Sequence, residues 1–256
     1  MSGIGVIVAL PPEIPAEFVR FDDRPRVEMH SFTIYTFTLA ATQHVAVQAG
    51  VGHIRAAEGA RLLIRRFSPQ GLLSFGFAGG LAPELTRGTL IIGTEVVYQD
   101  CSNQGTVASR ALVEQFHAAA VAEKLQVQRG RLVTSRHIVP DPSSKAELRD
   151  TSGACAVDME TAGIAEVAVE AGLPWAAVRA IVDGATDTLS PACIATLRED
   201  GHVAIGRLLR ASCRSPRLLW HMLRLARDVA TARRHLSQAF ERWAKSLVVP
   251  WHQPLG

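Results

Sequence analysis

The sequence predicts an α/β fold in which helices cover a parallel or mixed β-sheet. Along residues 4–187, short apolar segments rich in β-branched residues alternate with Ala-rich segments of helical periodicity. Hydrophobic residues make up 48% of the 256 residues, enough for one large core, and α/β folds of this size commonly form one domain. Several apolar runs end in glycines, as strands do at the sheet edge where α/β proteins bind ligands.

The first predicted strand covers residues 4–10, where IGVIVAL is apolar throughout. The next covers 44–52 (HVAVQAGVG) and ends in glycines. A helix follows at 54–67, because its apolar residues recur at steps of three and four. The run GLLSFGFAGGL at 71–81 is nearly continuous in apolar residues, which is typical of a strand buried on both faces.

Two further strands are predicted at 88–100 and 129–135, with a helix between them at 109–125. The stretch at 156–187, AVDMETAGIAEVAVEAGLPWAAVRAIVDGATD, then predicts a buried strand, a small-residue helix and a second buried strand.

The end of the chain predicts a long basic amphipathic helix at 215–248, with Ser215 and Pro216 suited to its N-cap and first position. Its apolar stripe comprises Leu218, Met222, Leu225, Val229, Ala232, Leu236, Phe240 and Trp243. Such a helix packs on the body or on a second subunit, or lies on an anionic membrane through its basic face. Nucleic acid is disfavoured as a partner, because base-stacking aromatic residues are not interleaved with the basic ones.

Charge divides the chain in two. From Arg207 onward, ten Lys or Arg stand against Asp228 and Glu241, a net of +8 that leaves −5 for residues 1–206 within the total of +3. We therefore expect a catalytic body at 1–206 and a basic helical extension at 207–248 packed on it.

Targeting and metal signals are not found in the sequence. The N-terminus lacks a basic-then-apolar pattern, and no apolar run reaches the roughly 18 residues that cross a bilayer, so we expect a cytoplasmic protein. The cysteines form no CxxC pair and lie at no metal-ligand spacing to histidines, which predicts reduced thiols and no metal site. They are Cys101, Cys155, Cys193 and Cys213.

Three acids lie at or beyond predicted strand ends. Glu13 follows ALPP after the first strand, Glu160 stands in the first turn of the small-residue helix, and Asp183 comes just past the last strand. Each alone has an ordinary explanation, as an exposed acid, a partner of the helix dipole or a turn residue. Together with the glycine turns at 50–52 and 76–80, they indicate a cleft whose carboxylates hold sugar hydroxyls and supply a proton.

The motifs VDMETAGIAEVA, GLPWAAVRAIVDGATD and GFAGGLAP resemble the nucleoside phosphorylase and nucleosidase superfamily, which includes purine nucleoside phosphorylases and methylthioadenosine/S-adenosylhomocysteine nucleosidases. The resemblance covers residues 4 to about 190. It implies a three-layer single domain with a central mixed sheet flanked by helices, and an enzyme that cleaves N-glycosidic bonds without a metal or organic cofactor.

By this resemblance, Glu160 holds the ribose hydroxyls and Asp183 protonates the purine at N7. Glu13 falls where the nucleosidases place the carboxylate that activates water, and Arg179 supports the strand. The implied substrate-binding set is Phe77, Ala78, Gly79, Ile138, Met159, Glu160 and Asp183.

The identity of the nucleophile stays open between water and phosphate. The segment ALPPE lacks the phosphate-binding glycine pattern of phosphorolytic members, and Ser74 and Phe77 occupy the glycine turn, which favours water. A phosphate site built differently would use Arg55 with Gly52 or His53, and inorganic phosphate would then be a co-substrate.

Residues 189–236 resemble the C-terminal extension of hopanoid-associated phosphorylases. This implies phosphorolytic removal of adenine from adenosylhopane as the first expectation, with the basic helix in peripheral contact with the inner membrane face. The alternatives are a hydrolytic 5′-methylthioadenosine/S-adenosylhomocysteine nucleosidase and a non-catalytic nucleoside-binding or scaffold protein. A homo-oligomer is expected in each case, since members of the superfamily are dimers or hexamers.

Overall fold

The computed structural model describes residues 2–15, 18, 27–29, 32–39, 42–189 and 216–247. The strands of these residues are β1 (Ser2–Val8), β2 (Val27–Met29), β3 (Phe32–Leu39), β4 (Thr42–Gln48), β5 (Gly71–Gly80), β6 (Leu90–Tyr98), β7 (Cys101–Val107), β8 (Val127–Thr134), β9 (Ala156–Asp158) and β10 (Trp175–Asp183). The helices are the 3-10 helix η1 (Pro11–Glu13) and α2 (His53–Phe67), α3 (Arg110–Ala122), α4 (Pro142–Ser152), α5 (Thr161–Glu170) and α8 (Pro216–Ser246).

The strands form one mixed sheet, part of which closes on itself. Strand β10 pairs with both β5 and β6, and β8 and β9 complete the ring from β6 back to β5. From β5 the sheet continues through β1, β4, β3 and β2. Because β1, β5 and β10 run parallel, their carboxyl ends meet at one edge of the sheet.

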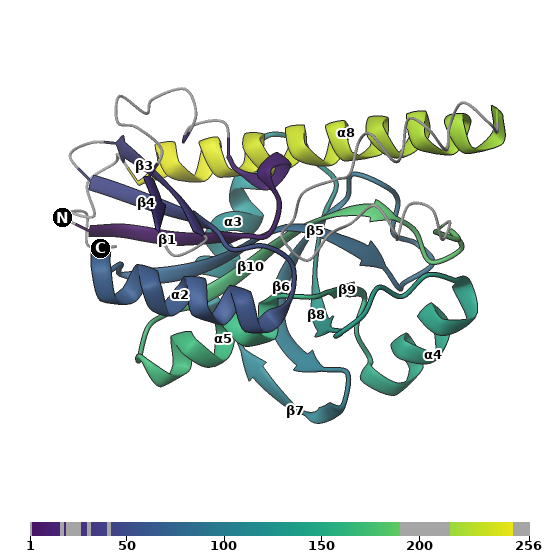
Figure 1. Ribbon diagram of the computed structural model, residues 1–256, viewed down its shortest axis with the longest axis horizontal. Helices are drawn as coiled ribbons and strands as arrows, with labels where there is room; N and C mark the ends of the chain where they lie inside the picture. The colour runs from purple at the N-terminus through teal and green to yellow at the C-terminus, as the bar shows by residue number, and fades with distance from the viewer. Residues whose placement is uncertain are drawn as a thin grey trace, which may run out of the picture.

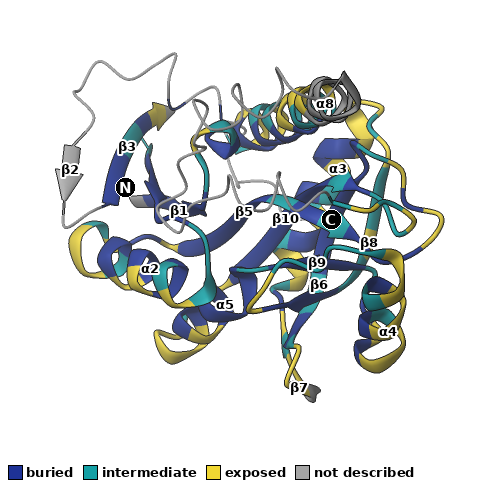
Figure 2. Cartoon of the chain, turned by 45° about the vertical axis from the view of Figure 1, so that its right-hand side comes forward, coloured by how far each residue is buried: buried dark blue, intermediate teal, exposed yellow. Residues whose placement is uncertain are grey.

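Helices cover both faces of the sheet, which gives three layers (Figure 1). Helices α3 and α8 contact each other and β10 on one face, and α2 and α5 contact each other on the opposite face. Strands β1, β5 and β10 are mostly buried, whereas β7 is largely exposed and α2, α4 and α5 expose their outward sides (Figure 2). The mixed α/β architecture predicted from the sequence is confirmed.

The sequence patterns located most elements but missed strands β2, β3 and β7 and helix α4. The predicted strand at 44–52 ends earlier, at Gln48, because Gly50 and Gly52 have positive φ angles of 87° and 106° that end the extended backbone. The predicted strand at 88–100 is β6, which ends at Tyr98, where the chain turns back into the antiparallel strand β7.

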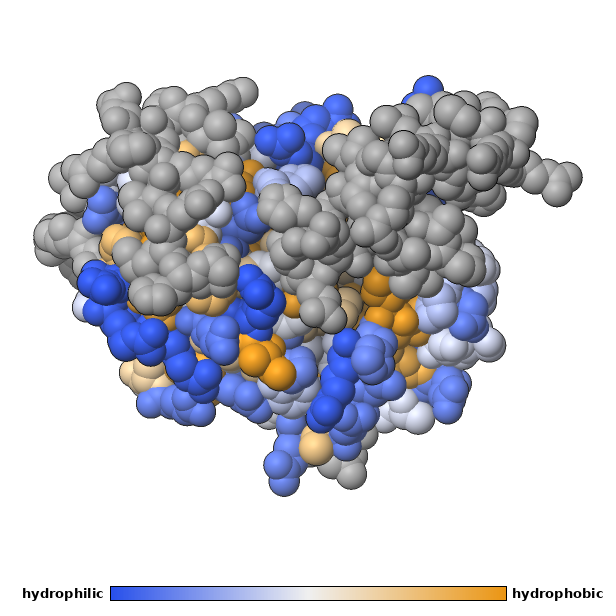
Figure 3. Space-filling model, viewed as in Figure 1, coloured by the Kyte–Doolittle hydropathy of each residue, from blue (hydrophilic) through white to orange (hydrophobic). Residues whose placement is uncertain are grey.

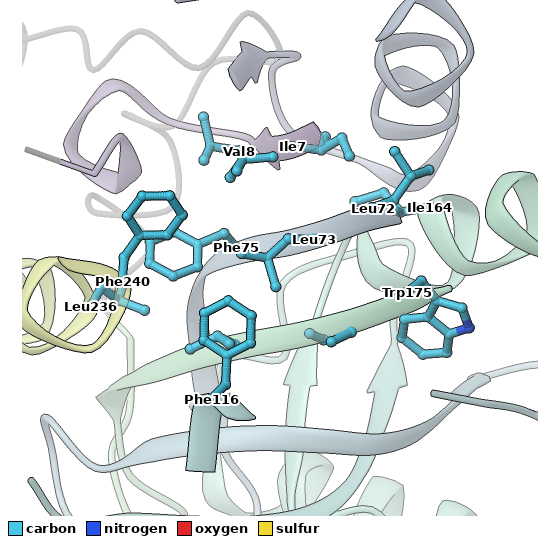
Figure 4. Packing of buried hydrophobic residues seen from close by; sticks show 14 of the residues in the cluster. Ile7, Val8, Leu72, Leu73, Phe75, Phe116, Ile164, Trp175, Leu236 and Phe240 are labelled. Atoms are coloured by element: carbon cyan, nitrogen blue, oxygen red, sulfur yellow. The ribbon is translucent and has the colours of Figure 1, made fainter. Parts of the chain in front are cut away.

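Aromatic side chains pack the second half of α8 against the body. Trp243 is 2% exposed, and its ring stacks on Phe116 with centroids 4.6 Å apart. Phe240 lies 5.8 Å from Phe75, ring to ring, in the interior of the molecule (Figure 4). Nδ1–H of His235 donates to the carbonyl of Gly88 at 2.7 Å.

The apolar stripe predicted for this helix is buried at Ala232, Leu236, Phe240 and Trp243. The structure does not describe the side chains of three other members of the stripe, Leu218, Met222 and Leu225. The predicted domain boundary at 206/207 also lies outside the described residues. No helix within the described parts of the chain is both long and apolar enough to cross a membrane.

A buried histidine borders this helix. His44 of β4 is 2% exposed, and its Nδ1 accepts a hydrogen bond from the Ile4 N–H at 3.3 Å. Its ring lies edge-on to Trp243, with centroids 6.0 Å apart. Burial lowers the pKa of His44 from 6.5 to about 4, because a charged imidazole would lose its hydration here.

The protein should therefore lose stability in acid through His44. Between about pH 6.5 and about pH 4 the unfolded chain binds the proton that the folded chain excludes, which removes about 3 kcal/mol of unfolding free energy as the pH falls. In His44→Gln the amide oxygen still accepts from Ile4 but does not titrate, so this part of the pH dependence should vanish. Urea unfolding across this range measures it, and an unchanged pH dependence in the variant would contradict the prediction.

Candidate active site

Glu13 is fixed by backbone donors from two strand ends. Oε2 accepts hydrogen bonds from the N–H groups of Ala9 and Leu10 at 2.8 and 2.7 Å, and Oε1 accepts one from Phe77 at 2.8 Å. The paired prolines before it form η1, which returns the side chain to the carboxyl end of β1. The result is an almost fully buried carboxylate held between β1 and β5.

Arg179 of β10 is the cation at the centre of the site. Its Nη2 donates to Ser74 Oγ at 2.7 Å and to Thr161 Oγ1 at 2.9 Å. Nε lies 2.8 Å from Oδ2 of Asp158, close enough for an ion pair although without hydrogen-bonding geometry. The guanidinium is 1% exposed, so these contacts replace the water it has lost.

Glu160 lies between Arg179 and the glycine turn that precedes α2. Its Oε1 accepts the N–H of Gly52 at 3.0 Å, and its Oε2 lies 3.7 Å from Nη2 of Arg179. The expectation that Glu160 stands in the first helical turn is wrong by one position. Helix α5 begins at Thr161, and Glu160 is the N-cap residue, whose side chain makes no capping hydrogen bond and reaches across the site instead.

Gly76 lies where Glu13 and Arg179 approach each other. A Cβ atom at this position would come within 2.5 Å of Glu13 Oε1 and 2.6 Å of Arg179 Nη1. Both charged groups therefore occupy the space that a side chain would fill, which explains a glycine in the middle of a buried strand.

Asp183 is the last residue of β10 and lies beside the carboxyl end of β5. It pairs in register with Gly79, where a Cβ atom would meet Asp183 Oδ2 at 3.3 Å. Its Oδ2 lies 2.5 Å from Nζ of Lys145, a fully buried lysine of α4. The structure thus brings Asp183 to the same sheet edge as Glu13 and Glu160.

Burial raises the pKa values of the three carboxyl groups at this edge of the sheet. Burial raises the pKa of Glu13, against the opposing effect of Arg179 and of three backbone donors. Burial also raises the pKa of Glu160 to about 7, where Arg179 opposes the shift and Asp158 and Glu13 add to it. The pKa of Asp183 is raised too, by burial, with Lys145 acting in the opposite direction. A raised pKa makes a carboxylate a stronger base and lets a carboxyl group keep its proton to higher pH, which suits general acid–base catalysis.

The other residues expected in the site have these places. Phe77, Ala78 and Gly79 form the end of β5, with Phe77 and Gly79 half-buried. Met159 is half-buried between β9 and α5, and its N–H lies 3.4 Å from Glu160 Oε2. Ile138 is half-buried in the segment after β8. Their contact with a substrate stays a prediction.

Arg55 and Gly52, expected to form an alternative phosphate site, are engaged with the protein. Nε of Arg55 donates to the Ala49 carbonyl at 2.7 Å, and its guanidinium carbon lies 5.7 Å from the centroid of the Phe32 ring. The Gly52 N–H is taken by Glu160. Phosphate binding there stays a prediction.

Sequence reasoning missed two charged residues of the site. Asp158 accepts hydrogen bonds from Thr134 and Thr161 and pairs with Arg179. It was detectable as an acid on a buried strand within the VDMET motif. Lys145 carried no such signal, because it belongs to the polar helix PSSKAELRDTS. Within the described ranges, no group of three or more His, Cys, Asp or Glu could hold a metal ion.

The chain is similar in sequence to known nucleosidases. A family model described as the phosphorylase superfamily matches residues 3–214. A 5′-methylthioadenosine/S-adenosylhomocysteine nucleosidase of Geobacillus thermodenitrificans is 33% identical over 194 residues, which are 70% of this chain and 82% of that protein. The corresponding protein of Anoxybacillus flavithermus is 29% identical over 196 residues, 70% of this chain and 84% of its own.

Two solved structures have similar folds. The Neisseria meningitidis 5′-methylthioadenosine/S-adenosylhomocysteine nucleosidase, in complex with methylthio-immucillin-A, gives a TM-score of 0.76 at 23% identity, covering 96% of this chain and 100% of that one. A futalosine hydrolase mutant of Helicobacter pylori gives 0.71 at 17% identity, covering 94% and 99%.

The charge cluster predicts that Arg179→Met will destabilise the protein strongly. Asp158 and Glu160 would lose their buried cation, at a cost of at least about 3 kcal/mol in unfolding free energy near neutral pH. The deficit should shrink as the pH falls, because protonation removes the unpaired charges. Urea unfolding of Arg129→Met is the control. This substitution breaks an exposed ion pair with Glu114 and an exposed contact with His117, and it should change the unfolding free energy by less than about 1 kcal/mol. Equal effects of the two substitutions would contradict the assignment.

Proposed function

The chain belongs to the phosphorylase superfamily, and we propose that within it the protein hydrolyses the N-glycosidic bond of 5′-substituted adenine nucleosides, with 5′-methylthioadenosine and S-adenosylhomocysteine as its first substrates. The observation that carries this proposal is Glu13, a buried carboxylate fixed by three backbone N–H groups beside Arg179.

Glu13 favours water over phosphate as the nucleophile. A phosphate anion would have to bind against this carboxylate, and like charges repel strongly where water is excluded. The donors of Arg179 are already directed to Ser74, Thr161 and Asp158. Oε2 of Glu13 already accepts two hydrogen bonds, but Oε1 accepts only one and keeps acceptor capacity for a water. The raised pKa of Glu13 makes its carboxylate a better base.

The other acids suit the two halves of the substrate. As the C1′–N9 bond breaks, the sugar becomes positive and the adenine negative. In this proposal Glu160 holds the ribose hydroxyls and stabilises the positive sugar. Asp183 protonates N7 of the departing base. We infer the adenine base and the 5′-thio substituents of the substrate from the relatives, which are named 5′-methylthioadenosine/S-adenosylhomocysteine nucleosidases.

Adenosylhopane is the second candidate substrate, with a phosphorolytic or hydrolytic cleavage. The supporting observation is the basic surface of α8, where Arg227, Arg233, Arg234, Arg242 and Lys245 are exposed. However, a solved nucleosidase structure covers 96% of this chain. The part of the chain that it leaves uncovered is much shorter than the 31 residues of α8, so most of this helix lies within the shared fold. The helix is therefore not by itself a sign of a lipid substrate. Peripheral membrane contact stays a prediction.

We also propose that the protein is a homo-oligomer. Large apolar side chains are exposed on adjacent elements, at Ile54 of α2, Val107 of β7 and Val169 of α5. Helix α5 contacts both α2 and β7, and hydrophobic residues interrupt the hydrophilic surface over α2 and α5 (Figure 3). Light scattering coupled to gel filtration should give a multiple of the 27.6 kDa chain mass, and Val169→Glu should lower it. A monomeric mass for the unmodified protein would contradict this.

The function is tested by adenine release from 5′-methylthioadenosine, S-adenosylhomocysteine and adenosylhopane, each with and without phosphate. Release should be independent of phosphate, and the oxygen of isotopically labelled water should appear at C1′ of the sugar product. Asp183→Asn and Glu13→Gln should lower kcat by at least about 100-fold, since each removes one proton-transfer group.

The exposed acids Asp150 and Glu123 provide matched controls, and their amide variants should retain full activity. Formation of ribose-1-phosphate derivatives would assign phosphorolysis instead. Binding of a nucleoside without adenine release would favour the non-catalytic alternative.

A further inference from the structure

A buried lysine touches the acid proposed to protonate the adenine. Lys145 has no exposed surface, and its Nζ lies 2.5 Å from Oδ2 of Asp183. The same nitrogen donates to the carbonyls of Gly184 at 2.7 Å and of Asp187 at 3.3 Å. These acceptors account for all three hydrogens of an ammonium group.

This contact conflicts with Asp183 acting alone as the acid. A neighbouring ammonium stabilises the ionised carboxylate, which has no proton to give. A pair made of one carboxyl and one amine nevertheless holds one transferable proton, whichever member carries it. Lys145 uses Oδ2, and none of the described residues donates a hydrogen bond to Oδ1, which leaves that oxygen for a substrate.

The surroundings allow the proton to move without leaving a polar group unpaired. If the proton passes from Nζ to Asp183, the neutral amine keeps two N–H groups for the carbonyls of Gly184 and Asp187, and its lone pair accepts the carboxyl proton. Only the hydrogen directed at Asp183 is exchanged. The two carbonyls hold the amine in position in either state.

Charged side chains also hold the loop at 184–187, whose carbonyls accept from Lys145. Oδ2 of Asp187 accepts the Gly184 N–H at 2.6 Å, and its Oδ1 lies 2.6 Å from Nη2 of Arg87, in the turn before β6. Arg87 also lies 3.2 Å from Asp228 of α8, measured from Nε to Oδ2. Among the described residues, Asp187, Arg87 and Asp228 are the charged groups linked to the loop at 184–187, and they stabilise the loop whose carbonyls position Lys145.

We propose that Lys145 is the positioning residue that holds the proton which Asp183 delivers to the leaving adenine. This rests on the proposed function. As the C1′–N9 bond breaks, its electron pair goes to the adenine, Lys145 passes its proton to Asp183, and Asp183 gives that proton to N7. Water bonds to C1′ through oxygen and gives its proton to Glu13. Proton exchange of Glu13 and Lys145 with solvent then restores the enzyme.

The pH dependence of kcat/KM distinguishes this role from a structural one. In the unmodified enzyme the pair keeps a transferable proton until both of its members are deprotonated, so kcat/KM should hold its plateau to a higher pH than the carboxyl group alone would allow. In Lys145→Met, Asp183 must hold the proton alone and should lose it in the range of a buried carboxyl. The alkaline limb should then move down by at least about one pH unit.

Lys145→Arg separates positive charge from proton donation. Arginine stays protonated at all accessible pH values, so this variant should not restore the plateau. Lys245→Met, at an exposed lysine that pairs with Glu241 on the surface of α8, is the matched control and should keep the unmodified profile. Thermal unfolding and circular dichroism check that each variant is folded.

Failure of this proposal is distinguishable from failure of the proposed function. Absence of adenine release by the unmodified enzyme contradicts the function. An active enzyme whose own alkaline limb lies in the carboxyl range contradicts the role of Lys145, whether or not the variants fold. A Lys145→Met profile that coincides with the unmodified one, or a plateau restored by Lys145→Arg, also overturns it.

Discussion

The guanidinium of Arg179 is the constraint on which the site depends. Three acids, Glu13, Asp158 and Glu160, lie around one buried point at the edge of the sheet, and without a cation their mutual repulsion would force them apart or into their neutral forms. Arg179 reaches these acids from β10, the strand that closes part of the sheet by pairing with both β5 and β6. The charge that permits the chemistry and the strand that organises the fold are therefore one element.

The strand ends turn this charge balance into a geometry. The parallel strands β1, β5 and β10 deliver Glu13, Gly76 and Asp183 to one edge, and the short strand β9 brings Asp158 and Glu160 to it from the opposite direction. Backbone N–H groups, rather than flexible side chains, orient Glu13 and Glu160. Such groups are already ordered by the sheet, so the site loses little entropy when a substrate binds.

Much of this site was predictable, because acids at the ends of apolar strands contradict the pattern around them. Glu13, Glu160 and Asp183 stood out for that reason. Lys145 did not, since its burial comes from the way α4 meets the loop after β10, and helix α4 itself has a polar sequence without a strong apolar period. Strands β3 and β7 were missed because hairpin partners are fixed by pairing more than by local composition.

The cradle of Glu13 has a consequence for how such enzymes diverge. Three backbone N–H groups with an arginine nearby make a receptor for an oxyanion, and in this chain the oxyanion is covalently attached as a side chain. Shortening that one side chain would leave the receptor unoccupied and its donors unpaired. A free anion from solution would then be the natural occupant. Hydrolytic and phosphorolytic lineages built on this scaffold can thus differ by whether this receptor holds a side-chain carboxylate or a free anion such as phosphate.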